Sequence, residues 1–415
     1  MARSQLGIAV AVQILVMSVW FAAAAAVPSL KADWGISSGA AGWLTTAVQI
    51  GFVFGALGAG LLNLADRVPV GPLVFGAGAL AALSTAAVPL LAGGLVPALP
   101  LRFLTGVALA GVYPVVVRQV VSWFGGSRAL AMGALLGALT LGSGLPHLVG
   151  AFGDLPWRTV LLVTASMAGL GALAALRLRL GPFKAPAAHF HPGYLTQMFR
   201  DRRQRDVNFG YFGHMWELYA FWAWIPAFLA AARPATSEAG LALAAFVVIG
   251  VAGGIGCLLA GVAARRRSAI AAARLALLTS AACCAISPLA YAAPLVLLGA
   301  VAIVWGAAVI ADSPMFSAAL SVAADRRYVG TALTLQMAIG FSITAIAIRV
   351  LPLIADAVGW RWTFLALLPG PALALVALRG GADAGVAAGP EDLLERGVDA
   401  RNHPSEKHVA ESHRD

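Results

Sequence analysis

The sequence predicts an all-α membrane protein with twelve transmembrane helices in two pseudo-symmetric six-helix bundles. Three observations lead to this fold class. Of the 415 residues, 60% are hydrophobic and only 11% are charged, a composition far from that of soluble domains. The apolar residues form twelve runs, each of about 20 residues or more, which is the length that crosses a bilayer as a helix. The first six runs and the last six also share landmarks, which indicates an internal repeat.

The twelve runs follow one another with short connections, except at the middle of the chain. In the first half we expect helices near residues 6–30, 39–63, 70–92, 97–121, 128–151 and 157–178. In the second half we expect them near residues 207–231, 238–263, 268–291, 294–319, 329–351 and 360–379. The expected organisation is an N-terminal six-helix bundle (1–178), a polar, basic linker (179–206), a C-terminal six-helix bundle (207–379) and a disordered tail (380–415).

Four landmarks relate the two halves at offsets of 198 to 203 residues: Pro28 with Pro226, Pro114 with Pro314, Arg128 with Arg327, and Trp157-Arg158 with Trp360-Arg361. Each pair alone is a weak signal, but four pairs at a nearly constant offset indicate a repeat. Parallel repeats of transmembrane helices are an organisation typical of secondary transporters.

The positions of the basic residues predict the orientation in the membrane. Of the 28 lysines and arginines, 22 lie on the side that holds both ends of the chain, and 6 lie on the other side. Loops that carry an excess of lysine and arginine stay in the cytoplasm. We therefore expect a multi-pass protein of a bacterial inner membrane with both termini, the linker and the tail in the cytoplasm.

Several function classes are excluded by what the sequence lacks. The net charge of +10 comes from short clusters between apolar runs, without the aromatic-interleaved basic surface of a nucleic-acid-binding protein. Cys257, Cys283 and Cys284 lie in apolar runs, which favours packing over a disulfide or metal site. No G-x-S-x-G, Walker or HExxH motif is present, so we predict no enzymatic activity and no cofactor.

Three motifs carry a resemblance to a known family. The loop from Gly60 to Asp66-Arg67 resembles a shortened G-x-x-x-D-R motif, Arg102-Phe-Leu-Thr-Gly106 resembles an R-x-x-x-G motif, and Trp157-Arg158 recurs in the second half. On these residues the sequence resembles the major facilitator superfamily of secondary transporters over residues 6–379. The resemblance implies alternating access, a monomer and a cytoplasmic gate at Asp66 and Arg67. The basic residues that normally follow the first motif are replaced by Val68 to Pro72, so only the Asp-Arg pair carries over.

The fifth predicted helix distinguishes among members of that family. It reads Gly133-Ala-Leu-Leu-Gly137 onward to Pro146 and lacks the Gly-Pro pair of the drug-proton antiporter signature, which argues against drug export. The Tyr113-Pro114 and Trp123-Phe124 stretch is loosely similar to the nitrate/nitrite and cyanate permeases. The glycine-rich nitrate signature itself is absent.

Two carboxyl groups and one histidine stand inside predicted membrane helices. Glu217 lies about 15 Å deep in the seventh helix, near the midplane, with His214 one turn earlier on the same face. Asp312 in the tenth helix lies at a similar depth, next to Pro314. A carboxyl group in hydrocarbon is expensive to ionise and marks a proton or ion path. We expect Glu217 and Asp312 to couple protons and His214 to modulate Glu217. The alternative is structural hydrogen bonding, by Glu217 to a tyrosine or by Asp312 across the backbone gap before Pro314.

Basic side chains give further candidates. The family motif implies a proton-coupling role for Arg102, and snorkelling to the membrane interface is the alternative. Arg118 is expected to form a gate ion pair with Asp66 or with a carboxylate of the other half. Arg349 is interpreted as an interfacial anchor, and His147 as a packed or interfacial histidine rather than part of a proton path.

The resemblance also implies a substrate site among helices 1, 4, 7 and 10. The residues expected there are Tyr113, Trp222, Tyr219, Gln13 and Trp305. Packing is the alternative for the aromatic residues, and tryptophan is also common in interfacial belts. Because the buried carboxyl groups occur in the second half only, we expect that half to handle protons and the first half to supply substrate contacts.

These features predict a proton-coupled secondary active transporter of a small polar solute, with an anion slightly favoured. Its expected partners are the solute, protons and the lipid bilayer, with no nucleic acid. One alternative is a proton antiporter that exports a drug or another cationic or amphipathic compound. Another is a non-transporting membrane sensor, which the short polar tail disfavours because it is too small for an effector domain.

Overall fold

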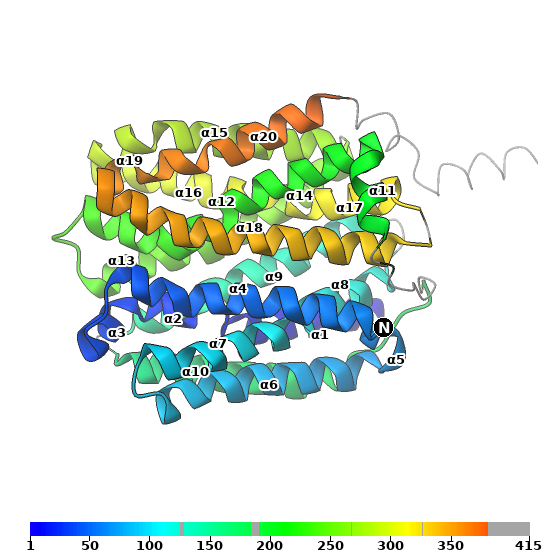
Figure 1. Cartoon of the computed structure of the whole chain (residues 1–415), viewed down its shortest axis with the longest axis horizontal. Coiled ribbons are helices and arrows are strands. Elements are labelled where there is room, and N and C mark those ends of the chain that lie inside the picture. The colour runs from blue at the N-terminus through cyan, green and yellow to red at the C-terminus, as the bar shows by residue number, and fades with distance from the viewer. Residues whose placement is uncertain are drawn as a thin grey trace, which may run out of the picture.

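The twelve predicted spans form two groups of helices that lie side by side (Figure 1). The computed structural model describes residues 1–124, 128–153, 155–183, 191, 193–266, 268–325 and 327–380. Over these residues the chain is helical and contains no strand. The fold class predicted from the sequence is confirmed, whereas the domain boundaries remain a prediction. Part of the linker and the tail from residue 381 lie outside the described residues.

The first group is built from ten helices. They are α1 (Ala2–Met17), α2 (Ala22–Ala25), α3 (Val27–Trp34), α4 (Ser38–Leu61), α5 (Leu64–Arg67), α6 (Val70–Leu91), α7 (Leu95–Ala110), α8 (Tyr113–Val121), α9 (Arg128–Gly150) and α10 (Trp157–Ala175). The first span is broken into α1, α2 and α3, and the fourth into α7 and α8.

The second group begins with the short helix α11 (Tyr194–Arg200) that precedes the seventh span. The others are α12 (Arg202–Ala232), α13 (Glu238–Phe246), the π-helix η1 (Val247–Ala252), α14 (Gly253–Arg266), α15 (Ala269–Ala292), α16 (Leu295–Ala311), α17 (Ser313–Ala323), α18 (Val329–Val358), α19 (Trp360–Thr363), η2 (Phe364–Leu367), α20 (Pro369–Ala377) and η3 (Leu378–Gly380). Among the described residues, 10 helical segments are long and apolar enough to cross a membrane. The broken first span and α12 complete the twelve.

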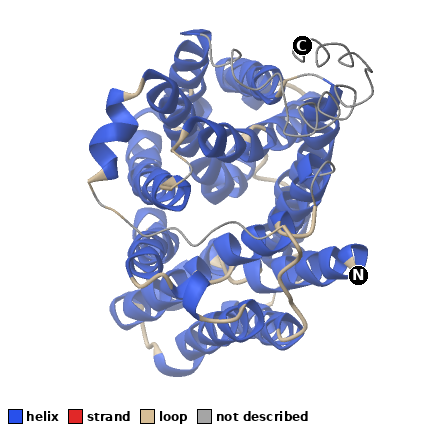
Figure 2. Cartoon of the chain, turned by 90° about the vertical axis from the view of Figure 1, so that its right-hand side faces the viewer, coloured by secondary structure: helices blue, strands red, loops and turns tan. Residues whose placement is uncertain are grey.

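The ends of the spans define two faces of the molecule. The N-terminus, α5, α8, α11 and α17 lie at one end in Figure 1, and Figure 2 looks onto that end. We call it the N-terminal face. The other end, which we call the opposite face, carries the connections after α3, α6, α9, α12, α15 and α18.

The fourth and tenth spans break at equivalent positions. α7 ends at Ala110 and α8 starts at Tyr113, while α16 ends at Ala311 and α17 starts at Ser313. Each new helix has a proline in its first turn, Pro114 or Pro314, where the missing N–H needs no partner. The pseudo-symmetry predicted from the sequence therefore includes the positions of these helix breaks. Asp312 occupies in α17 the N-cap position that Val112 occupies in α8.

The two groups meet along two pairs of spans, α4 with α18 and α9 with α13, η1 and α14. Glycines bring the second pair into backbone contact. A Cβ atom on Gly133 would lie 2.8 Å from the Cys257 carbonyl oxygen, and one on Gly144 would lie 3.0 Å from the Gly250 backbone. The small residues noted in the sequence of the fifth span thus serve the boundary between the halves, as small-x-x-x-small patterns do in membranes.

Glycines also set the contact between the second and fourth spans. A Cβ atom on Gly51 would lie 2.0 Å from the Phe103 carbonyl oxygen, and one on Gly106 would lie 2.0 Å from the Val48 carbonyl oxygen. No side chain fits at either position unless the helices move apart. Gly106 is the last residue of the R-x-x-x-G motif, so the motif glycine is explained by this close approach.

We predict that Gly106→Ala separates α4 from α7 and lowers the melting temperature of the purified protein by several degrees, although alanine is the better helix former by about 1 kcal/mol. Gly76→Ala on α6 is the matched control, because nothing lies within 4 Å of a Cβ atom there. Thermal unfolding in detergent measures the melting temperatures of the two variants. Equal melting temperatures for the two variants would contradict the close contact.

Candidate functional site

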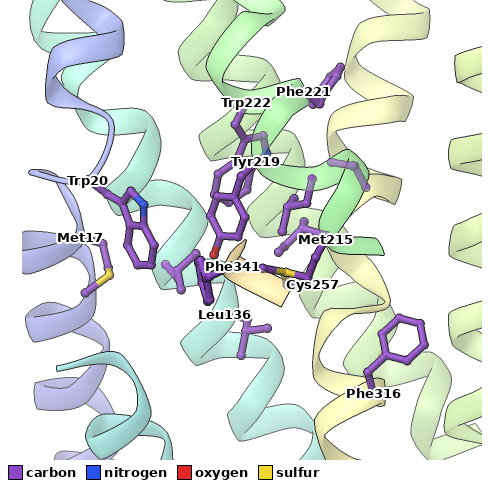
Figure 3. Close-up of a cluster of buried hydrophobic side chains, with 14 of the residues drawn as sticks. Met17, Trp20, Leu136, Met215, Tyr219, Phe221, Trp222, Cys257, Phe316 and Phe341 are labelled. Atoms are coloured by element: carbon purple, nitrogen blue, oxygen red, sulfur yellow. The ribbon is translucent and has the colours of Figure 1, made fainter. Parts of the chain in front are cut away.

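Aromatic side chains from both halves form a layer at the centre of the molecule (Figure 3). The aromatic layer comprises Trp20, Phe21 and Phe52 of the first half and Tyr219, Trp222 and Phe341 of the second. Trp20 stacks on Tyr219 with ring centroids 5.5 Å apart and planes 13° from parallel, and Phe52 lies 4.2 Å from Phe341. The layer therefore joins the two halves through ring contacts alone.

Buried polar side chains without partners lie on the spans that carry this layer. Both side-chain polar atoms of Gln13 and of Gln49 are buried and have no hydrogen-bond partner among the described residues, and the same holds for Nε1 of Trp20 and of Trp222. An unpaired buried donor or acceptor costs about 1–3 kcal/mol, so native proteins normally pair it with protein, water or ligand. These groups are suited to bind water or a polar solute.

His214 and Asp312 form a close pair between the seventh and tenth spans. His214 Nδ1 of α12 lies 2.8 Å from Asp312 Oδ1, and both side chains are almost fully buried. The distance is that of an ion pair, but the ring N–H is not aligned on the oxygen, and His214 Nε2 has no partner among the described residues. Asp312 can occupy this position because the chain breaks there between α16 and α17.

Glu217 has a different environment, inside the second half. Its Oε1 atom accepts hydrogen bonds from Ser280 Oγ at 2.6 Å, Cys284 Sγ at 3.2 Å and Trp305 Nε1 at 2.7 Å. These donors come from α15 and α16, so the carboxyl group serves as a polar anchor for three helices. The tyrosine expected as a structural partner is replaced by this set, and His214 contacts Asp312 rather than Glu217.

We predict that Glu217→Gln retains most of the stability of the wild type, since the amide oxygen can still accept the three hydrogen bonds. Glu217→Leu leaves the donors without an acceptor, at a cost of about 1–3 kcal/mol for each one that finds no other partner. Melting temperatures in detergent should fall in the order wild type, Gln, Leu, with Gln close to wild type.

The exposed Glu238 of α13 supplies the matched control, and its Gln and Leu variants should melt together. A leucine variant of Glu217 as stable as the glutamine variant would show that the three hydrogen bonds contribute little.

Arg102 is fully buried and does not reach the membrane interface. Its guanidinium group donates to the carbonyl oxygens of Val19 at 3.0 Å, Trp20 at 2.9 Å and Leu44 at 3.4 Å. Val19 and Trp20 lie where α1 has ended, so Arg102 supplies hydrogen bonds that the broken first span cannot make within itself. Unwound backbone at membrane depth is tolerated where it is buried in protein in this way.

Ion pairs lie at the N-terminal face of each half. Arg118 Nη2 contacts Asp66 Oδ1 at 2.5 Å, and Arg118 also donates to the Ala65 carbonyl oxygen, while Arg67 is exposed. Arg118 thus pairs with Asp66, within one half. In the second half Arg327 contacts Asp325 at 2.7 Å, and its hydrogen bonds lower the pKa of Asp325 to about 2, so this carboxyl group is ionised at neutral pH.

Arg349 crosses between the halves near the opposite face. It extends from α18 to donate to the Gly39 carbonyl oxygen of α4, and its guanidinium group lies 4.4 Å from the centre of the Trp43 ring. Gly42, one turn from Gly39, packs against the Trp224 ring of α12, which a Cβ atom would approach to 3.0 Å. We call Arg349, Gly39 and Trp43 the opposite-face latch. The interfacial anchor expected at Arg349 is therefore also an inter-half contact.

The structure brings some predicted substrate residues together and separates others. Tyr219 and Trp222 belong to the aromatic layer, and Gln13 lies two turns before Trp20 on the same span. Tyr113, the first residue of α8, is partly buried and packs against the core. Trp305 is turned away from this region, because its indole N–H is bonded to Glu217 and its ring packs against Phe221 and Phe364.

Sequence reasoning did not identify the partners of these residues. The apolar runs give no sign of these partners, which are Ser280, Cys284, Phe52 and Phe341. Ser280 lies 63 positions and Cys284 lies 67 positions from Glu217 in the sequence. The position of Trp20, seven residues after Gln13 in the same predicted span, is the signal that could have placed it in the aromatic layer.

Two groups of six spans with matching helix breaks and polar residues at their boundary have the architecture of a membrane transport protein built from two repeats. A family model described as the Major Facilitator Superfamily matches residues 9–348, and the chain belongs to this family. Comparison of the sequence with curated proteins gives no significant match.

Solved structures of transporters share the fold at low sequence identity. The proton:xylose symporter XylE is 14% identical with a TM-score of 0.69, over 92% of this chain and 95% of that one. The nucleoside transporter NupG is 13% identical with a TM-score of 0.69, over 91% and 99%. A human organic anion transporter is 17% identical with a TM-score of 0.66, over 91% and 99%. At these identities the likeness establishes the fold and not the solute.

Proposed function

We propose that this protein is a proton-coupled secondary active transporter that moves a small polar solute across a bacterial inner membrane by alternating access. In this proposal it works as a monomer, and the N-terminal face, with both termini, is cytoplasmic. The family supports transport of a small molecule, and the positive-inside rule supports the orientation. The buried His214–Asp312 pair carries the proposal of proton coupling.

Asp312 and His214 hold the coupling proton. The pair lies at the only break of the tenth span among the described residues, between two helices of the second half, and its atoms are incompletely hydrogen-bonded. A carboxyl group beside an imidazole can exchange a proton when its surroundings change, and here Asp312 Oδ1 and His214 Nε2 have no hydrogen-bond partner among the described residues. Glu217 is the second candidate, but its Oε1 atom is held by three donors, and Arg102 is held by three carbonyl oxygens.

We predict that Asp312→Asn abolishes solute accumulation driven by an imposed pH gradient while solute exchange without a gradient persists at a measurable rate. The amide keeps the size of the side chain but cannot bind and release the coupling proton. Proteoliposomes containing a solute found by screening anions, cations and neutral compounds measure both activities. Asp356→Asn on the exposed end of α18 is the matched control. Normal gradient-driven accumulation by Asp312→Asn would refute the assignment.

The two faces supply the gates. At the opposite face the latch of Arg349, Gly39 and Trp43 joins α18 to α4, and it must separate when the solute enters or leaves there. At the N-terminal face Asp66 and Arg118 pair within the first half and fix the position of α5 beside α8. Arg67, exposed next to them, completes the gate residues implied by the family motif.

We predict that Arg349→Gln weakens the latch and shifts the population toward the state open at the opposite face. Thr45→Cys, on a buried position of α4, reports this opening through labelling by a membrane-impermeant thiol reagent. Labelling should rise several-fold in the Arg349→Gln background. Arg361→Gln is the control, because Arg361 lies at the same face but contacts Trp362 and Pro288 of its own half. Unchanged labelling would show that the latch does not hold this face closed.

The preference for an anion drawn from the sequence depended on arginines close to the cavity. Arg102, Arg118 and Arg349 each donate to oxygen atoms of the protein. Of their buried guanidinium atoms only Arg102 Nη1 has no hydrogen-bond partner among the described residues, so these arginines give little support for an anion.

A further inference from the structure

We infer that the transported solute is electrically neutral and carries hydrogen-bonding groups on a ring that packs against the aromatic layer. The inference rests on the proposed function, since it concerns the solute of the same central site. It departs from the anion favoured by the sequence, and three observations carry it: the charges, the unpaired polar atoms and the geometry of the rings.

The buried ionisable groups of the central spans each have hydrogen-bond or ion-pair partners within the protein, although Arg102 Nη1 and His214 Nε2 have none among the described residues. Arg102 is bonded to three carbonyl oxygens, Glu217 to three donors, and Asp312 lies beside His214. A charged solute held at the midplane needs an opposite charge there, because desolvating an unpaired ion is costly. Using His214 or Asp312 for that purpose would break their pair. A neutral solute leaves all three arrangements intact.

On the spans that carry the aromatic layer, the buried polar side chains with no hydrogen-bond partner for any of their atoms are neutral amides and indole N–H groups, whereas Arg102, His214 and Asp312 each leave one atom without a partner among the described residues. Gln13 offers one acceptor and two donors with no partner among the described residues, although the whole side chain is buried. Trp20, seven residues later in the broken first span, adds its own unpaired N–H. Gln49, one turn before Phe52 of the layer, adds a second unpaired amide. Such groups match hydroxyl, carbonyl or amide groups of a solute.

The rings of the layer provide a flat apolar surface at the boundary between the halves. Trp20 of the first half lies nearly parallel to Tyr219 of the second, at 13° with ring centroids 5.5 Å apart (Figure 3). Phe21 is also nearly parallel to Tyr219, at 6° with ring centroids 6.0 Å apart. Rocking of the halves separates these stacked pairs. The ring of a solute can then occupy the space between them, because it replaces one aromatic contact by another.

Matched series of compounds that differ only in charge test this inference. The first series is D-glucose, D-glucuronate and D-glucosamine, and the second is nicotinamide, nicotinate and nicotinamide methylated on its ring nitrogen. Binding to the purified full-length protein is measured at mildly acidic pH by thermal stabilisation and by quenching of tryptophan fluorescence. We expect the neutral member of at least one series to bind with a Kd at least about tenfold below those of its charged relatives.

Variants place the binding at the proposed site. Gln13→Leu and Trp20→Leu should each weaken binding of the neutral compound by about tenfold, whereas Gln197→Leu on exposed α11 and Trp362→Leu on exposed α19 should not. If the leucine variants fail to fold, Gln13→Glu serves instead. It places a negative charge at the site and should shift the preference toward the cationic member of the series.

Tighter binding of a charged member in both series, or no binding by any neutral member, would overturn the inference. Its failure is distinguishable from failure of the proposed function. A charged compound that binds and is accumulated under a pH gradient refutes the neutral solute but leaves proton-coupled transport standing. A neutral compound that binds at Gln13 and Trp20 but is never accumulated under a pH gradient refutes proton-coupled transport and leaves the neutral solute standing.

Discussion

A polar group buried in hydrocarbon must find its partner inside the protein, and most of this architecture depends on that constraint. Arg102 illustrates it: the first span can leave the helical path after Met17 because a guanidinium group from α7 donates hydrogen bonds to the carbonyl oxygens of Val19 and Trp20. Glu217 applies the same rule in the second half, where one oxygen atom accepts hydrogen bonds from α15 and α16. Both groups are polar anchors for helices within one half, whereas the aromatic layer at the boundary between the halves is built from rings.

The exceptions to that constraint mark the functional region. Atoms of Gln13, Gln49, Trp20 and Trp222 are buried without partners among the described residues, and all lie on spans that border the aromatic layer. The His214–Asp312 pair, at the break of the tenth span, is a buried ionisable pair in which His214 Nε2 and Asp312 Oδ1 have no hydrogen-bond partner among the described residues. Alternating access requires such groups to change partners as the halves rock, whereas Arg102 and Glu217 keep theirs within one half.

Much of the fold follows from local patterns in the sequence, because span length, basic loops and the repeat of Pro114 at Pro314 each depend on neighbouring residues. The break of the first span does not follow from local patterns, because the run from Ala22 to Ala26 favours a continuous helix. The unwound backbone is bonded by Arg102, which is distant in the sequence. The depth of Glu217 and Asp312 could be estimated from helical rise. Their partners could not, because His214, Ser280 and Trp305 are selected by how helices pack in space rather than by spacing along the chain.

The proposed transport cycle depends on exchange of a proton at Asp312 and His214 when the solute moves. The most direct test adds a solute that is known to bind to the purified protein in weakly buffered solution and records the pH. Coupling at this pair predicts a stoichiometric uptake or release of protons by the wild type that Asp312→Asn lacks although it still binds the solute. An identical pH change in both proteins would contradict the claim.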